Sequence, residues 1–321
     1  MKIYHFGLAV TLSLGASQSA MALNITFDYS LDNSGFFDTE QKKQVLEAAG
    51  NFWGSRITSH LNAAVSIPGG SSYDARFGNP SDIIEDNGDL IARYTTKNNF
   101  SVQENEYKIF VGSDTLPGST VALSSFGGVD AENLTVNGDS NYEQNVRTRG
   151  KDGFVSWGGW LAFDNEPSTT WYFDDDLTTT DVPDGQSDFY SFALHELGHI
   201  LGIGQSEQWE NNIFDFPGGK IYRGDNVLAI NNGLPVDLTD DGTHFADGTN
   251  GLGGGLDGQI DALMDPTIED GTRKLPTNLD YAVLKDIGWE VSASPVPVPT
   301  AVWLFGTAIL GLFGTRRRQA A

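Results

Sequence analysis

The spacing of apolar residues along the chain predicts a few helices and several short strands. Between Asp38 and Ser55, apolar residues recur at helical spacing and Asp38 is a suitable N-cap. Asp280–Ile287 predicts a short closing helix before Gly288 and Trp289. Apolar and β-branched runs predict strands at Leu23–Phe27, Ala63–Ile67, Tyr107–Val111 and Gly159–Phe163, with Thr120–Ser124 as a candidate edge strand.

A further helix is predicted around residues 189–200. Ser187 and Asp188 are good N-cap residues, and the apolar run 189–194 continues as a buried helix would. Gly202 and Gly204 mark its end. From 204 to about 275 the chain is rich in glycine and aspartate, which predicts little regular structure. Strands, then a helix, then an irregular half indicate an α+β domain with its functional site between the two parts.

The beginning of the chain has the layout of a secretory signal peptide. Lys2 precedes an apolar run from Phe6 to Leu14, and small residues at Ala20 and Ala22 follow. We therefore expect cleavage after Ala22 and export of the remainder.

Residues 292–321 combine a proline-rich stretch at 295–299, 14 apolar or small residues at 301–314, and arginines at 316–318. A bilayer span needs about 20 residues, and the basic cluster favours a cytoplasmic end. With Trp303-Leu304-Phe305-Gly306, the segment resembles the PEP-CTERM sorting signal of exopolysaccharide-producing Gram-negative bacteria. The resemblance implies transient membrane contact and removal by an exosortase-type transpeptidase. An ordinary C-terminal membrane anchor is the alternative, and either one implies a cell-surface, extracellular-matrix or secreted protein.

The charge balance narrows the classes of partner. The chain has 43 acidic and 19 basic residues, a formal net charge of −24. The negative electrostatic potential of such a chain disfavours nucleic acid and anionic membranes as partners. It makes structural cations such as Ca²⁺ plausible, although no calcium-binding motif is present. The chain has no cysteine, which excludes thiol nucleophiles and thiolate metal sites.

The predicted helix at 189–200 carries the candidate chemistry in the sequence His195-Glu196-Leu197-Gly198-His199. Residues i and i+4 lie on one helix face, so His195 and His199 can present two imidazoles to one metal ion. Glu196 lies beside such an ion, where its carboxylate can take a proton from a metal-bound water. The pattern therefore predicts a catalytic zinc site.

Catalytic zinc takes three protein ligands and a water, so a third ligand is needed. Between residues 23 and 291 the other histidines are His60 and His244. His60, near a predicted helix end, is expected to be a solvated surface residue. We favour His244, because closing the 41-residue loop 203–243 costs only modest entropy. A carboxylate such as Asp247 is the rival ligand.

These motifs resemble the leishmanolysin-type branch of the metzincin zinc peptidases. In that branch the third histidine follows an insertion, as His244 does, and a methionine then passes beneath the metal in a tight turn, matching Met264 in 262–266. Compact metzincins would have a histidine at Gln205, which leaves open whether Gln205 contributes to the site. The resemblance implies an α+β fold with a twisted mixed sheet and helices above a zinc cleft. It divides the chain into an upper catalytic subdomain at 23–203 and an irregular lower subdomain at 204–291.

The sequence thus predicts an exported zinc endopeptidase that acts on protein or peptide substrates. Zinc on the three histidines would lower the pKa of its bound water to about 7, and Glu196 would act as the general base. A different class remains open, namely an envelope- or exopolysaccharide-associated binding module whose zinc is structural. Such a site would need four closed protein ligands.

Overall fold

In the computed structural model the described residues are 22–128, 133–174, 176–253 and 259–292. The predicted signal peptide (residues 1–22), except Ala22, and the predicted sorting tail (292–321), except Ser292, lie outside these ranges. Among the described residues, no helix is both long and apolar enough to cross a bilayer.

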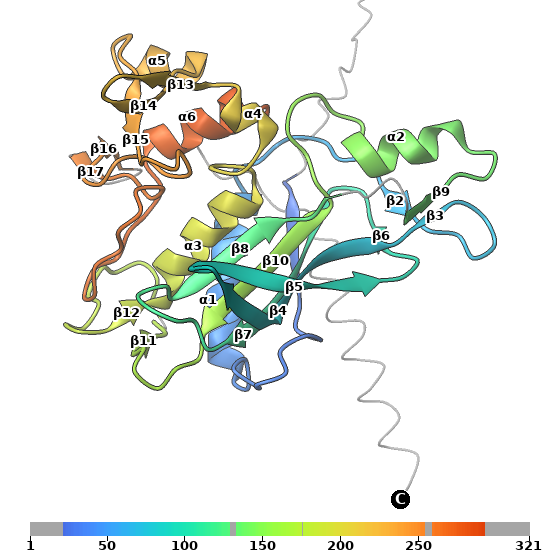
Figure 1. Cartoon of the computed structure of the whole chain (residues 1–321), viewed down its shortest axis with the longest axis horizontal. Coiled ribbons are helices and arrows are strands. Elements are labelled where there is room, and N and C mark those ends of the chain that lie inside the picture. Colours follow the sequence, from blue (N-terminus) through green and yellow to red (C-terminus); the bar gives the residue numbers. More distant parts are fainter. Residues whose placement is uncertain (1–21, 129–132, 175, 254–258, 293–321) are drawn as a thin grey trace, which may run out of the picture.

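The chain is a mixed α+β protein built around one four-stranded sheet (Figure 1). The strand order is β1 (Asn24–Asp28), β7 (Glu106–Asp114), β10 (Gly158–Asp164) and β8 (Ala122–Phe126). β1, β7 and β10 are parallel, whereas β8 is antiparallel to β10 and forms one edge. The four strands predicted at these places are therefore present, with β8 shifted two residues from the predicted Thr120–Ser124.

Side chains alternate between the two faces along each strand, and on the central strands β7 and β10 both faces are buried. On β7, Tyr107, Ile109 and Val111 join the core formed with the helices, whereas Phe110 joins a second core. The first face packs on α1 (Glu40–Gly54) and α3 (Phe189–Ile200). The second face packs under a long hairpin of β4 (Ala75–Asp86) and β5 (Asp89–Lys97) (Figure 1).

The β4–β5 hairpin was not predicted, although the sequence carries its signal. Asn87 and Gly88 form the turn with φ of 56° and 95°, and an Asn-Gly pair is the usual sequence of such two-residue turns. The other small elements at this end are β2 (Ala64–Val65), β3 (Ser72–Tyr73), β6 (Ser101–Val102), β9 (Leu134–Thr135) and α2 (Ser140–Thr148).

The segment after α3 is more regular than predicted, because short hairpins form between its glycine turns. It contains a three-stranded antiparallel sheet, two short helices and a further hairpin, which gather at one end of α3 with α6 (Figure 1). These elements are α4 (Glu207–Glu210), β13 (Ile213–Phe216), β14 (Gly219–Tyr222), α5 (Asp225–Ile230), β15 (Val236–Leu238), β16 (Asn250–Leu252), β17 (Gln259–Asp261) and α6 (Asn278–Asp286).

Two predicted helix starts need correction. The N-cap of α1 is Thr39, whose side chain accepts from the Lys42 N–H, so Asp38 lies outside the helix. The closing helix α6 begins earlier than the predicted Asp280, because Thr277 and Asp280 form a reciprocal capping box.

Candidate metal centre

Helix α3 is held rigidly on several sides. Asp188 is its N-cap and accepts from the Ser191 N–H and hydroxyl, as predicted for Asp188. Ser187 instead pairs with Trp171 in the short strands β11 (Trp171–Tyr172) and β12 (Ser187–Asp188). These contacts fix the helix that carries the predicted site.

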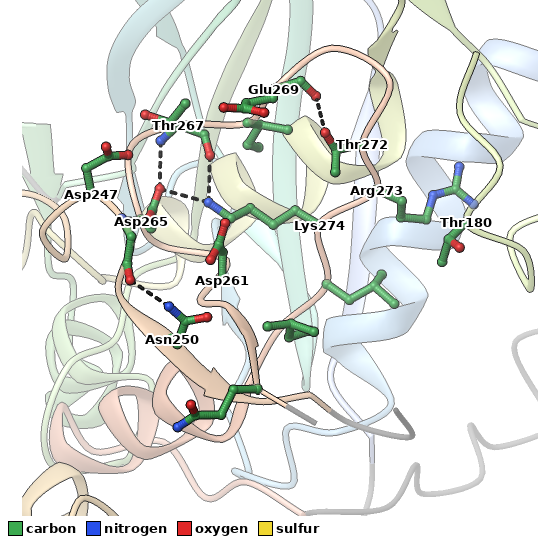
Figure 2. A pocket seen from close by; sticks show the side chains of 15 residues that line it. Thr180, Asp247, Asn250, Asp261, Asp265, Thr267, Glu269, Thr272, Arg273 and Lys274 are labelled. Carbon is green, nitrogen blue, oxygen red and sulfur yellow. Dashed lines mark hydrogen bonds and ion pairs between the residues drawn. The ribbon is translucent and has the colours of Figure 1, made fainter. Parts of the chain in front are cut away.

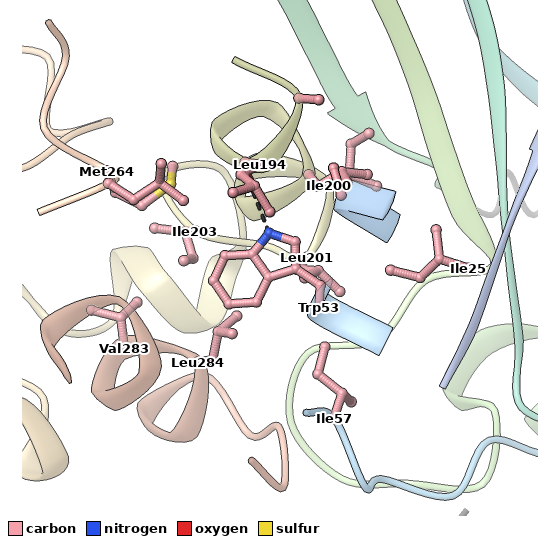
Figure 3. Packing of buried hydrophobic residues seen from close by; sticks show 14 of the residues in the cluster. Ile25, Trp53, Ile57, Leu194, Ile200, Leu201, Ile203, Met264, Val283 and Leu284 are labelled. Atoms are coloured by element: carbon pink, nitrogen blue, oxygen red, sulfur yellow. Dashed lines mark hydrogen bonds between the residues drawn. The ribbon is translucent and has the colours of Figure 1, made fainter. Parts of the chain in front are cut away.

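Three aromatic side chains bind backbone carbonyls of this helix and its C-terminal end. The Trp53 indole N–H donates to the Leu194 carbonyl at 3.0 Å within the core (Figure 3). The Tyr107 hydroxyl donates to the carbonyl of Ile200 at 2.7 Å, and the Trp289 indole donates to that of Leu201 at 2.8 Å. The helix ends at Ile200, and Gly202, whose φ is +103°, lies just past this end, where the sequence predicted a stop. Its histidines therefore project from a helix that is held at several points by hydrogen bonds.

The structure brings His195, His199 and His244 together. The Nε2 atoms lie 3.1 Å apart between His195 and His199, 3.2 Å apart between His195 and His244, and 3.0 Å apart between His199 and His244. Among the described residues, these three form the group of histidine and carboxylate side chains able to hold a metal ion. The prediction of His244 as the third member of the group agrees with this geometry.

The opposite ring nitrogens fix the tautomers. Nδ1 of His195 lies 2.8 Å from the Leu263 carbonyl, and Nδ1 of His199 lies 2.9 Å from the Ile203 carbonyl. A carbonyl oxygen only accepts, so each Nδ1 carries the proton and donates it. Nδ1 of His244 lies 2.8 Å from the Thr243 hydroxyl, which can accept in the same way. His195 and His199 therefore direct their Nε2 lone pairs toward the centre of the group, and His244 does the same when its Nδ1 donates to Thr243.

The electrostatics keep all three rings neutral. Burial, together with the neighbouring His199 and His244 rings, lowers the pKa of His195 well below its ordinary value. Burial and His244 lower the pKa of His199 to about 4, and burial lowers the pKa of His244. Three converging lone pairs repel one another unless a cation lies between them. The separations are close to the roughly 3.3 Å between two nitrogens that bind one tetrahedral zinc at about 2.0–2.1 Å.

Glu196 and the three histidines line one cleft, which has a volume of about 400 Å³. The cleft is bounded by Ser119–Ser124 and α3 on one side and by Thr243, His244, Pro266 and Ile268 on the other. The Glu196 side chain is buried, and this burial raises the pKa of its carboxyl group. A buried carboxylate with a raised pKa in the same cleft as three converging imidazoles is suited to accept and return a proton.

Met264, the residue of the predicted Met-turn, packs against helix α3 at Gly198. It is fully buried in the core that also contains Leu194 and Ile203 (Figure 3). Its N–H and that of Leu263 donate to the two carboxylate oxygens of Asp280, at 3.0 and 3.1 Å. The turn therefore places the Leu263 carbonyl against His195 and the methionine against α3.

Two other sequence candidates are not members of the histidine group, although Gln205 lines the same cleft. The Gln205 amide N–H donates to the Ser124 carbonyl at 3.0 Å, so Gln205 links the cleft wall to β8. Asp247 is not part of the histidine group and lines a separate cavity in which the Lys274 ammonium binds Asp265 at 2.8 Å and the Thr267 carbonyl at 2.6 Å (Figure 2).

His60 is exposed, with its ring 3.7 Å from Glu104, as expected for a surface histidine. It takes no part in the metal centre.

Sequence reasoning missed the supporting residues Thr243, Gly204 and Asp280. A Cβ at Gly204 would lie 2.1 Å from the Thr243 carbonyl oxygen, so this glycine lets the His244 loop approach α3. The pattern Thr277-Asn-Leu-Asp280 is a capping-box signature that marks Asp280. Thr243 has no signal beyond its position next to a predicted ligand.

No family model matches this chain, and no curated protein matches it significantly in sequence.

Proposed function

We propose that this chain is an exported zinc-dependent endopeptidase of the metzincin type, with the leishmanolysin-like arrangement of its third histidine. The observation that carries the proposal is the convergence of three neutral imidazoles beside a buried glutamate in an open cleft. His195, His199 and His244 would hold the ion. Zinc in such a site polarises a carbonyl group and lowers the pKa of a coordinated water to about 7.

Glu196 supplies the proton transfer. Its carboxylate accepts the proton of the attacking water and later delivers it to the leaving amine. Its burial keeps bulk water from solvating the charge, and α3 fixes its distance from the histidines.

The edge of β8 supports binding of an extended peptide. Because the Ser124 carbonyl accepts from Gln205 rather than from β10, this residue directs its backbone groups away from the sheet. Alternation along an antiparallel strand places the Ala122 peptide groups on the same outer edge. An extended substrate can therefore add to the sheet at Ala122 and cross the cleft next to Glu196.

The rival function is a binding module with a structural zinc, which would need four closed protein ligands. The cleft beside the three histidines is open, and within the described residues the metal-binding group has three members. Both features favour a site that leaves a coordination position for water or substrate.

The test uses the exported part of the chain, residues 23–294, loaded with zinc. We expect the wild type to cleave casein or gelatin, Glu196→Gln to keep one zinc while losing about 10²–10⁴-fold in turnover, and His244→Ala to lose zinc. Near-normal turnover of Glu196→Gln would refute the base assignment. A zinc-loaded wild type that cleaves no protein or peptide would favour the binding module.

A further inference from the structure

A second hollow continues the histidine cleft along the far side of Phe192. It has a volume of about 500 Å³ and shares five lining residues with the cleft, so the two hollows adjoin each other. The shared residues are Ser119, Val121, Phe192, Pro266 and Ile268. A side chain of a substrate bound at Glu196 can therefore enter this hollow, which we call the side pocket.

The side pocket changes character with distance from the histidines. Val121, Phe192 and Ile268 make its shared entrance largely apolar. The lining residues that it does not share with the cleft include the hydroxyl-bearing Ser168, Thr169, Thr170 and Ser187. Among the described residues that line it, Asp270 alone bears a charge.

Asp270 is fixed in place by both neighbouring segments. The Ser187 hydroxyl donates to one of its carboxylate oxygens at 2.7 Å, and the N–H of Gly271 donates to the Gln186 carbonyl at 2.8 Å. The segment that carries it is pinned by two buried cations, since Lys274 binds Asp265 and Arg273 binds Asp188. The carboxylate is thus positioned before any ligand arrives.

We propose that the side pocket selects a lysine or arginine side chain of the substrate, with Asp270 as the specificity-determining residue. The inference rests on the proposed peptidase function. Lysine and arginine have long apolar stems that can lie against Phe192 and Ile268 while their heads remain hydrated and polar. The charged head then meets the Asp270 carboxylate and the surrounding hydroxyls, which all accept hydrogen bonds from it.

A matched pair of charge reversals tests the assignment. Asp270→Lys places a cation in the side pocket, whereas Glu269→Lys makes the same charge change one residue earlier, where the side chain lines the cavity around Lys274 instead (Figure 2). Zinc-loaded wild type and both variants would be given a mixed peptide library, and the cleavage sites would be determined by mass spectrometry.

We expect the wild type and Glu269→Lys to favour lysine or arginine over glutamate by about fivefold or more, at one position within two residues of the cleaved bond. In Asp270→Lys this preference should invert, and in Asp270→Asn it should flatten. A binding measurement on zinc-loaded Glu196→Gln should rank a lysine peptide above its glutamate counterpart without any turnover.

The outcomes separate the two levels of the proposal. Cleavage with no basic preference at any position, or equal changes in Asp270→Lys and Glu269→Lys, would overturn the role of Asp270 and leave the peptidase standing. A zinc-loaded wild type that cleaves no peptide would overturn both.

Discussion

The thioether sulfur of Met264 lies directly against Gly198 on helix α3. A Cβ atom built at Gly198 would be 2.6 Å from that sulfur and 3.3 Å from the terminal methyl carbon. Gly198 lies between the two candidate ligands His195 and His199 and directly precedes the second. The close approach of the methionine to α3 therefore depends on the absence of a side chain at position 198.

Gly198→Ala should destabilise the protein, although alanine usually stabilises a helix interior by about 0.5–1 kcal/mol. Overpacking against Met264 should outweigh this gain, with a net loss of about 1–2 kcal/mol in the free energy of unfolding. Denaturant unfolding measures the effect. Repeating the substitution in a Met264→Ala background provides the control, because the penalty should disappear there. A penalty of equal size in both backgrounds would show that the two residues are not coupled.

Thr243→Val should weaken zinc binding. The substitution keeps the side-chain shape but removes the hydroxyl that lies 2.8 Å from Nδ1 of His244. Losing such a partner typically costs about 10- to 100-fold in metal affinity. Competition titration against a chelator measures this loss, and Thr243→Ser, which keeps the hydroxyl, should bind zinc as the wild type does. Equal affinities for the valine and serine variants would contradict the assigned tautomer.

Arg273→Met should be among the most destabilising single substitutions. The guanidinium group is buried and lies 2.8 Å from Asp188, the N-cap of α3, and 2.9 Å from Asp174. Its removal leaves buried carboxylates unpaired, which typically costs about 3–5 kcal/mol. Arg93→Met, which breaks the exposed pair with Asp82, should cost less than about 1 kcal/mol. Chemical denaturation of the two variants compares these costs. Similar values would show that the buried ion pairs of Arg273 contribute no more than an exposed pair.

The stability of the protein should rise with pH above pH 8 because of Lys151. Burial lowers the pKa of its ammonium group from 10.5 to about 8. Between these values the folded chain releases the proton while the unfolded chain keeps it, so raising the pH favours folding. Unfolding free energies at pH 7, 8 and 9 should therefore increase more steeply for the wild type than for Lys151→Met. Parallel pH profiles would show that Lys151 keeps its proton in the folded protein.

The sequence by itself determined the local features of the metal centre. Histidines four residues apart must share a face if the segment is helical, and the caps and apolar run around 189–200 made it helical. The strands at 107–111 and 159–163 were equally easy to predict. Each is buried on both faces, so each is a nearly continuous apolar run in the sequence.

Only the tertiary structure decided how distant segments meet. His244 reaches the helix because Gly204 has no side chain to clash with the Thr243 backbone. The Leu263 carbonyl fixes the His195 tautomer, and Asp280 holds the turn that contains Leu263. The side pocket around Asp270 likewise joins segments from four parts of the chain. Such contacts depend on packing between residues far apart in sequence, and no local periodicity encodes them.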